Sequence, residues 1–198
     1  MNEQNKVTGV VLAGGLARRM NKQDKGLIEY HNRPMVSYAV DAMNQVASTV
    51  FINANRNISE YQHFGCPVIS DQTDTFDGPL AGVLSAMSHA DTDILCVMPC
   101  DSPLIKAEHL NKLLNAVTEK DIDIAVAFDG TRIHPVFLAL KTSLQTSLKR
   151  YLEQGDRKID LWLEQHRLFK VDFTQSAEVF LNINTLSELE SLEKNKDE

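Results

Sequence analysis

Short, continuous runs of apolar residues alternate along this chain with stretches that have the length and spacing of helices. A strand buried on both faces lacks the polar–apolar alternation of a half-exposed strand, and such strands are typical of a parallel sheet covered by helices. Val7 to Leu12 is the first run of this kind. Because strands that alternate with helices connect through crossovers, the sequence predicts a three-layer α/β fold, with a mainly parallel sheet and helices on both faces.

Turn signals and chain length complete the expected architecture. We expect strands at residues 7–12, 49–53, 68–70, 94–98, 122–128, 134–140 and 168–173, and helices at 35–46, 80–89, 110–117, 144–152, 159–163 and 186–192. The turn signal Asp129-Gly130 predicts that one strand, 134–140, pairs antiparallel with the strand before it. No repeat, linker or change of composition divides the 198 residues, so we expect a single domain over 1–198 with a charged tail at about 193–198.

Charge and cysteine content exclude several classes of protein. Twenty-seven acidic against 20 basic residues give a formal net charge of −7, which argues against nucleic-acid or anionic-membrane partners. No apolar run approaches the roughly 18 residues of a membrane span, and the N-terminal sequence lacks signal-peptide features. Cys66, Cys96 and Cys100 are odd in number and form no CxxC pair, which favours reduced, structural thiols in the cytoplasm.

The segment after the first strand is rich in glycine and in basic residues. In an open parallel sheet ligands bind at the carboxyl ends of the strands, so LAGGLARRMNKQDKG at residues 12–26 is well placed. Ala13, Gly14 and Gly15 leave backbone N–H groups free to approach an anion closely. Four bases that suit a triphosphate lie within eight residues: Arg18, Arg19, Lys22 and Lys25. Neither GxxxxGK[ST] nor GxGxxG is present, and the alternative is a surface turn with solvated charges.

The segment VMPCDSP, residues 97–103, follows another buried strand. Asp101 is therefore expected at the carboxyl edge of the sheet, where a carboxylate can hold Mg²⁺, an ion that binds hard oxygen ligands and bridges phosphates. The alternative is that Asp101 caps the helix that follows. Cys100 needs no part in phosphoryl chemistry and is expected to be structural.

Weaker signals lie near the same edge. DGPLAG at residues 77–82 is a glycine-framed helix start whose backbone is suited to reading a base edge, or is simply a well-formed helix start. Asn53 ends a strand and Asp71 follows one, so each is placed to contact a ribose or base, although singly such residues are more often turns or caps. The six histidines show no HExxH spacing, and no GxSxG nucleophile elbow occurs.

In series, these segments resemble the molybdenum cofactor guanylyltransferases, small bacterial enzymes of the nucleotidyltransferase (Rossmann-like) fold. The matching pieces occur in the family's order from Val7 to about Leu189: VVLAGGLARRM, DKGL, NAN, DGPLAG, PCDSP, HPVFLAL and FLNINTLSEL. A glycine loop alone would be a weak sign. LAGG with RM, DKGL, GPLAG and PCDxP in one chain is a specific one.

The resemblance implies transfer of GMP from Mg²⁺-bound GTP to the terminal phosphate of molybdopterin, which yields pyrophosphate and the guanine dinucleotide form of the cofactor. The implied GTP-binding residues are Leu12, Ala13, Gly14, Gly15, Lys25, Asn53, Asp71, Gly78, Pro79, Leu80 and Asp101. Asp101 is the implied metal ligand, and the implied catalytic residues are Lys25, Asp101 and Arg19. The implied acceptor-binding residues are Asn182, Asn184 and Arg157.

Two positions depart from the family pattern, and two other functions stay open. Asn21-Lys22 stand where the family usually has two glycines, and Leu186 stands in place of a proline. One alternative is a cytidylyltransferase acting on the same cofactor or on a sugar or polyol phosphate, but such relatives more often have LAAG and a loop serine. The other is a nucleotide-binding or cofactor-delivery protein without turnover. Other cofactor-biosynthesis proteins and molybdoenzyme chaperones are further candidate partners.

Overall fold

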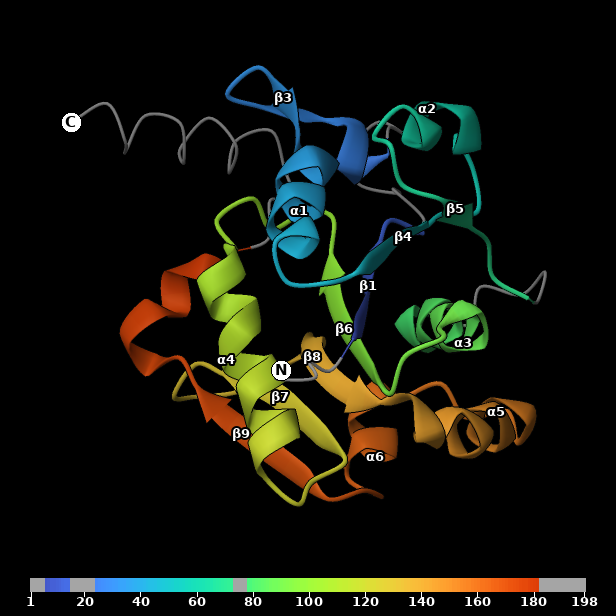
Figure 1. The fold of residues 1–198 in the computed structure, drawn as a ribbon, viewed down its shortest axis with the longest axis vertical. Helices are drawn as coiled ribbons and strands as arrows, with labels where there is room; N and C mark the ends of the chain where they lie inside the picture. The colour runs from blue at the N-terminus through green and yellow to red at the C-terminus, as the bar shows by residue number, and fades with distance from the viewer. Residues whose placement is uncertain (1–5, 15–23, 73–77, 182–198) are drawn as a thin grey trace.

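The computed structural model describes residues 6–14, 24–72 and 78–181. Its centre is a seven-stranded sheet with the order β5-β4-β1-β6-β8-β7-β9 (Figure 1). The strands are β1 (Val7–Leu12), β4 (Thr49–Asn53), β5 (Val68–Ile69), β6 (Ile94–Pro99), β7 (Ile124–Phe128), β8 (Ile133–Lys141) and β9 (Leu168–Asp172). In this sheet β8 is antiparallel to its neighbours β6 and β7, and the other neighbouring strands are parallel to each other. The predicted fold class is confirmed.

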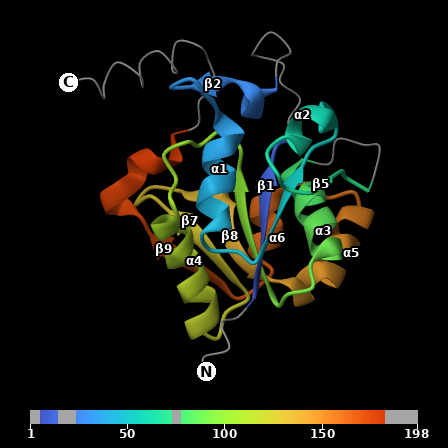
Figure 2. The ribbon, with the colours of Figure 1, turned by 45° about the horizontal axis from the view of Figure 1, so that its top comes forward.

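Helices cover both faces of the sheet (Figures 1 and 2). On one face lie α1 (Met35–Asn44) and α4 (Ala107–Glu119), and on the other lie α3 (Pro79–His89), α5 (Gln145–Glu153) and α6 (Ile159–Leu163). None of the helices in the described part of the chain is long and apolar enough to cross a membrane.

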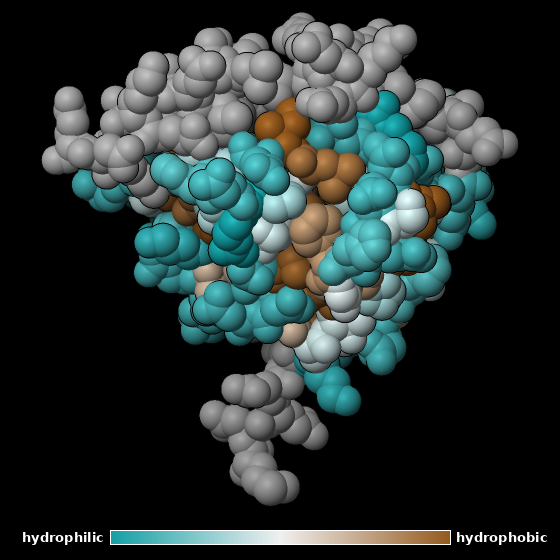
Figure 3. All heavy atoms as spheres, turned by 90° about the horizontal axis from the view of Figure 1, so that it is seen from above, coloured by the Kyte–Doolittle hydropathy of each residue, from teal (hydrophilic) through white to brown (hydrophobic). Residues whose placement is uncertain are grey.

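The two apolar cores explain why the central strands read as unbroken apolar runs. Val7 and Val11 of β1 belong to the core under α1 and α4, together with Val36 of α1. Val10, which points to the other face, packs in the core with Leu80 of α3. Seen from above, hydrophobic residues show mainly in a strip between two hydrophilic flanks (Figure 3). The amphipathic helices thus turn their polar sides outward.

Strand and helix ends agree with the sequence where an apolar run has sharp borders, and differ elsewhere. β1, β4 and α6 have the predicted bounds. α4 begins at Ala107 rather than at 110, because the backbone N–H of Lys106 donates to His109 Nδ1 at 2.9 Å and caps an extra turn. α1 ends at Asn44 instead of 46, and β7 begins at Ile124 instead of 122. The helix predicted at 186–192 lies outside the described residues.

Several short elements have no counterpart among the predictions. They are the 3-10 helices η1 (Lys25–Leu27), η2 (Thr142–Leu144) and η3 (Thr174–Phe180), the hairpin of β2 (Glu29–Tyr30) and β3 (Arg33–Pro34), and α2 (Ile58–Gln62). Apart from η3, which is interrupted by non-helical backbone at Ser176, these elements span only two to five residues.

Six strands deliver their carboxyl ends to the same edge of the sheet, here called the carboxyl edge. β6 and β7 are both antiparallel to β8, so they are parallel to each other, and β9 is parallel to β7. The residues that follow β1, β4, β5, β6, β7 and β9 therefore meet at this edge, which is where ligands bind in open α/β sheets.

Candidate active site

An ion pair between Lys25 and Asp101 lies at the carboxyl edge. Lys25 Nζ donates to Asp101 Oδ2 at 3.2 Å, although 76 positions separate the two residues along the chain. The Lys25 side chain is 29% exposed and that of Asp101 12% exposed, so both charges remain open to a ligand from one side. Asp101 is the second residue after β6 ends, at the carboxyl edge, as the sequence predicts.

Close packing of Gly26 sets the position of Lys25. A Cβ atom on Gly26 would lie 2.9 Å from Tyr61 Oη and 3.1 Å from Cys100 Sγ, so only glycine lets this loop approach the end of β6. Asp24, just before Lys25, is buried, accepts a hydrogen bond from Asn57 Nδ2 at 2.8 Å and pairs with Arg56. The start of the DKGL segment is thus anchored on both sides of its lysine.

The end of β1 is tied to the two strands beside it. The N–H of Ala13 donates to the Asn53 carbonyl at 2.8 Å, and the N–H of Cys100 donates to the Leu12 carbonyl at 3.0 Å. A Cβ atom on Gly14 would be 3.4 Å from the amide atoms of both Asn53 and Asn55. Leu12, Ala13 and Gly14 are therefore held against the carboxyl edge, whereas Gly15 and Arg19 lie outside the described residues.

Two asparagines orient the carboxylate of Asp71. Asn53 Nδ2 donates to Asp71 Oδ1 at 3.0 Å, and Asn55 Nδ2 donates to Asp71 Oδ2 at 2.7 Å. The backbone N–H of Asp71 donates in turn to Asn55 Oδ1 at 2.8 Å. The structure thus brings together Asn53 and Asp71, two predicted residues, and adds Asn55, which the sequence marked only as part of the NAN segment.

The start of α3 also faces this group. Gly78 has φ +71° and ψ −164°, a conformation that essentially only glycine adopts, and Pro79 opens the helix. Leu80 is fully buried and packs in the core on this face of the sheet. Gly82, the fourth residue of α3, lets the helix pack directly on Asn53 and Leu12, because a Cβ atom there would overlap both side chains.

The donor atoms around Asp101 suit a metal shared with a substrate. In the ranges 6–14, 24–72 and 78–181, no three His, Cys, Asp or Glu side chains form a ligand set for a metal ion. A single carboxylate beside a phosphate site fits Mg²⁺, which usually keeps several waters and takes phosphate oxygens as ligands. Burial, with the nearby charge of Asp101, raises the pKa of the Cys100 thiol. A sulfur ligand is also too soft for Mg²⁺, which prefers oxygen.

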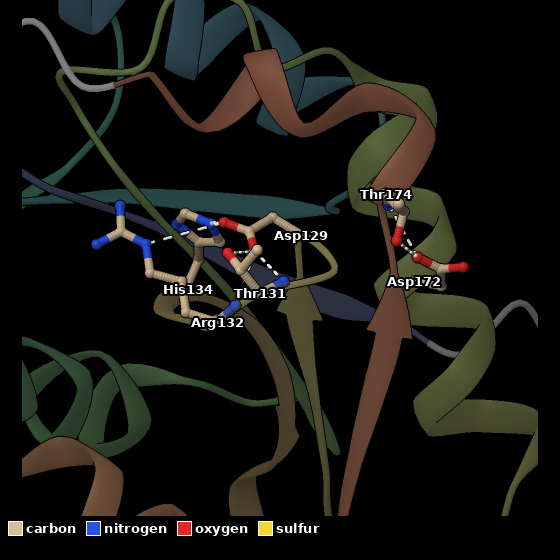
Figure 4. Close-up of polar contacts among 6 residues, drawn as sticks. All are labelled: Asp129, Thr131, Arg132, His134, Asp172 and Thr174. Carbon is tan, nitrogen blue, oxygen red and sulfur yellow. Dashed lines mark hydrogen bonds and ion pairs between the residues drawn. The ribbon is translucent and has the colours of Figure 1, made fainter.

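A second polar cluster lies where β7 ends and β8 begins (Figure 4). Asp129 Oδ1 accepts hydrogen bonds from the N–H and hydroxyl of Thr131 and from the N–H of Arg132. Asp129 Oδ2 lies 2.7 Å from Nε2 of His134. The sequence identified this segment as a turn followed by a strand, with HPVFLAL as a piece of the family pattern, and predicted no site residue in it. Its signal was the same as that of Asp101, a carboxylate directly after a buried strand.

The predicted acceptor-binding residues are only partly described. Arg157 lies in the loop between α5 and α6, where its Nη1 donates to the carbonyls of Leu152 and Asp156, each at 2.7 Å. Asn182 and Asn184 lie outside the described residues. The assignment of these three residues to the acceptor stays a prediction.

Comparison with known proteins identifies the family. The family model described as the MobA-like NTP transferase domain matches residues 9–169. The chain belongs to this family. It is 45% identical over 195 residues to the molybdenum cofactor guanylyltransferase of Shewanella piezotolerans, with 96% of each chain covered. It is 44% identical to the enzyme of the same name from Shewanella halifaxensis, covering 94% of this chain and 93% of the relative.

The solved structures agree with the MobA-like assignment at the level of fold. The molybdopterin-guanine dinucleotide biosynthesis protein A from Archaeoglobus fulgidus superposes with a TM-score of 0.80, at 20% identity, over 96% of this chain and 98% of that one. These comparisons confirm the predicted resemblance and the prediction that the chain is a nucleotidyltransferase.

Proposed function

We propose that this MobA-like protein transfers GMP from GTP to the terminal phosphate of molybdopterin and releases pyrophosphate. The names of relatives that are 40–45% identical over almost the whole chain support this reaction. The observation that carries the proposal is the Lys25–Asp101 pair, which places a cation and a carboxylate together at the carboxyl edge, next to the end of the glycine loop.

Lys25 and Asp101 divide the work at the triphosphate. Lys25 Nζ binds the phosphates, and its packing through Gly26 spares it much of the conformational entropy a free lysine would lose. Asp101, with phosphate oxygens and water, is the residue that would hold Mg²⁺. When bound, the ion supplies positive charge that reduces the repulsion between the triphosphate and the incoming phosphate. Arg19 is proposed to assist in binding the phosphates.

The remaining predicted residues bind the donor. The backbone N–H groups of residues 12–15 are proposed to hold the departing pyrophosphate. Asn53 and Asp71 contact the nucleoside, and their fixed orientation, with Asn55 as third partner, supports a preorganised site. The backbone at Gly78, Pro79 and Leu80 completes the nucleotide site.

No strong general base is required for the attack. The acceptor is already an ionised phosphate, so catalysis rests on positioning and on stabilising charge at the α-phosphorus. The acceptor is proposed to contact Asn182, Asn184 and Arg157. The three buried, free thiols suit a reducing cytoplasm, which we propose as the protein's location.

The first experiment offers the purified protein Mg²⁺ and molybdopterin with each nucleoside triphosphate separately, and measures dinucleotide and pyrophosphate. Product from GTP alone is the expected result. Product from CTP would overturn the choice of base, and binding of GTP without product from any donor would indicate a carrier protein or a different acceptor. Parallel reactions with and without inserted molybdenum test which form of the acceptor is used.

Variants of the ion pair test the assigned roles. Asp101→Asn and Lys25→Gln should each lower turnover about 10²–10³-fold, the typical loss for one preorganised contact. Asp91→Asn and Lys149→Gln are matched controls, because both side chains are exposed and lie outside the proposed site. Near-normal turnover of either ion-pair variant at saturating Mg²⁺-GTP would refute its catalytic role.

A further inference from the structure

The strand order divides the carboxyl edge into two halves. The proposed donor residues Asp71, Asn53 and Gly14 lie at the carboxyl ends of β5, β4 and β1, and Asp101 follows β6 in the middle of the sheet. β8, β7 and β9 form the other half. If the donor occupies the first half, the attacking phosphate approaches along the second, since it has to reach the phosphorus opposite the departing pyrophosphate.

The turn between β7 and β8 is built rigidly around Asp129. Its Oδ1 accepts from Thr131 N at 2.8 Å, Thr131 Oγ1 at 2.7 Å and Arg132 N at 2.8 Å. These hydrogen bonds, that of the Arg132 backbone first, hold the pKa of Asp129 well below its usual range. The carboxylate therefore stays ionised and accepts from His134, which requires a proton on Nε2 of that imidazole.

His134 is a buried support for this carboxylate. It is 8% exposed, and its ring stacks on Phe180 with the ring centres 4.3 Å apart and the planes 17° apart. A shift of register places it here, because Val126 of β7 pairs with Leu138 while the next residue, Ala127, pairs with His134. The strand thus bulges at the point where its imidazole meets Asp129.

Arg132 offers its guanidinium to solvent from this fixed turn. The side chain is 76% exposed, and its Nε lies 3.8 Å from Asp129 Oδ2. Among the described residues, its terminal nitrogens Nη1 and Nη2 have no hydrogen-bond partner. Figure 4 shows the side chain extending from the turn away from Asp172, which ends the outermost strand β9. In the order of the sheet, β8, which begins directly after Arg132, is the neighbour of β6, and Asp101 comes two residues after β6 ends.

We propose that Arg132 binds the terminal phosphate of the acceptor, with Asp129 and His134 as positioning residues. This inference rests on the proposed function. The planar fork of a guanidinium matches two phosphate oxygens and is the usual choice for bidentate phosphate recognition. The exposed, long contact with Asp129 aligns the group but is weak, so a phosphate competes with it easily.

Steady-state kinetics with each substrate varied in turn test the assignment. Arg132→Gln should raise KM for molybdopterin roughly 10- to 100-fold, the loss expected for a charge-assisted bidentate contact, and leave KM for GTP unchanged. Arg132→Lys keeps the charge but loses the fork, so its KM should fall between those of the wild type and Arg132→Gln. Asp129→Asn and His134→Gln should raise the same KM by smaller factors.

Arg167→Gln is the matched control. Arg167 is also an exposed arginine paired with aspartates, but it precedes β9 at the opposite edge of the sheet. Its substitution should change neither KM. An acceptor KM within twofold of wild type for Arg132→Gln, or an equal rise of both KM values, would overturn the assignment. A wild-type protein that forms no product would overturn this inference and the proposed function together. An active wild type, with an unchanged acceptor KM in Arg132→Gln, would overturn this inference alone.

Discussion

Packing of α3 on Asn53 and Leu12, two residues of the proposed nucleotide site, makes Gly82→Ala a test of how that site is built. A Cβ atom at residue 82 would lie 2.8 Å from Leu12 Cδ2 and 2.9 Å from Asn53 Cγ, and would overlap Asn53 Oδ1. Carbon atoms settle about 3.5–4.0 Å apart, so the Asn53 amide has to move by roughly 1 Å or the helix has to lift. Movement of the amide breaks the 3.0 Å hydrogen bond from Asn53 to Asp71, whereas lifting the helix loosens its packing on the sheet.

The expected loss of stability combines three effects. Alanine is favoured over glycine inside a helix by about 1 kcal/mol. Forcing an extra methyl group into a packed site costs about 1–3 kcal/mol. Leaving the buried Asn53 amide without its partner costs about 1–3 kcal/mol more. The costs of packing and of the lost hydrogen bond exceed the gain in helix propensity, so the free energy of unfolding should fall by about 1–5 kcal/mol.

Urea unfolding followed by tryptophan fluorescence measures this loss. The single tryptophan, Trp162, is fully buried and reports unfolding of the whole sheet assembly. The control is the same substitution in an Asn53→Ala background, where the overlap with the amide is gone and Gly82→Ala should cost at least about 1 kcal/mol less. An equal cost in both backgrounds, or a Gly82→Ala protein as stable as wild type, would refute the reasoning. Affinity for GTP should weaken in parallel with the loss of the Asn53–Asp71 hydrogen bond.

Two further predictions concern protonation. The hydrogen bonds from Arg167 lower the pKa of Asp123 to about 2, below the roughly 3.9 of an unfolded aspartate, so its contribution to stability is present above about pH 4 and is lost as the pH falls through about 2. Stability measured by urea between these pH values should fall less steeply for Asp123→Asn, and identical slopes would contradict this. Burial raises the pKa of Cys66 and Cys100 and brings that of Cys96 to about 12. A disulfide reagent should therefore react slowly with the thiols of the native protein, whereas in urea it should react with all three. Rapid reaction of a thiol in the native state would be the contrary result.

The sequence predicts the central strands well because their signal is local. β1 and β4 are apolar runs with polar or glycine borders, and a strand buried on both faces needs no other information. The β2–β3 hairpin has no such signal. Its two-residue turn, His31-Asn32, has positive φ at both positions, a conformation usually announced by glycine. α2 is a single short turn of five residues, so it shows no helical spacing of apolar residues, and its N-cap, Asn57, has φ 49°.

The candidate site depends on contacts between side chains that are far apart along the chain, and the sequence indicates these contacts only in part. The rule that ligands bind at strand ends finds Asp101 and Asn53 one at a time. It does not show that Lys25 reaches Asp101, because that contact depends on Gly26 packing on Cys100. The Asp129 cluster was missed for a related reason. Asp129-Gly130 is a sufficient turn signal by itself, and the bulge that brings His134 to it is a property of strand pairing.

The antiparallel strand β8 marks a seam that coincides with a division of the chain. Every strand on one side of the β6–β8 boundary comes from residues before 100, and every strand on the other side comes from residues after 123. Under the proposed function, the first segment recognises the donor and the second the acceptor. Replacing the chain after Asp101 with that of a relative should therefore change the acceptor specificity and leave the nucleotide specificity unchanged. The pairing between β6 and β8 is the contact that such a chimaera has to preserve. The fold can change one substrate without redesigning the pocket for the other.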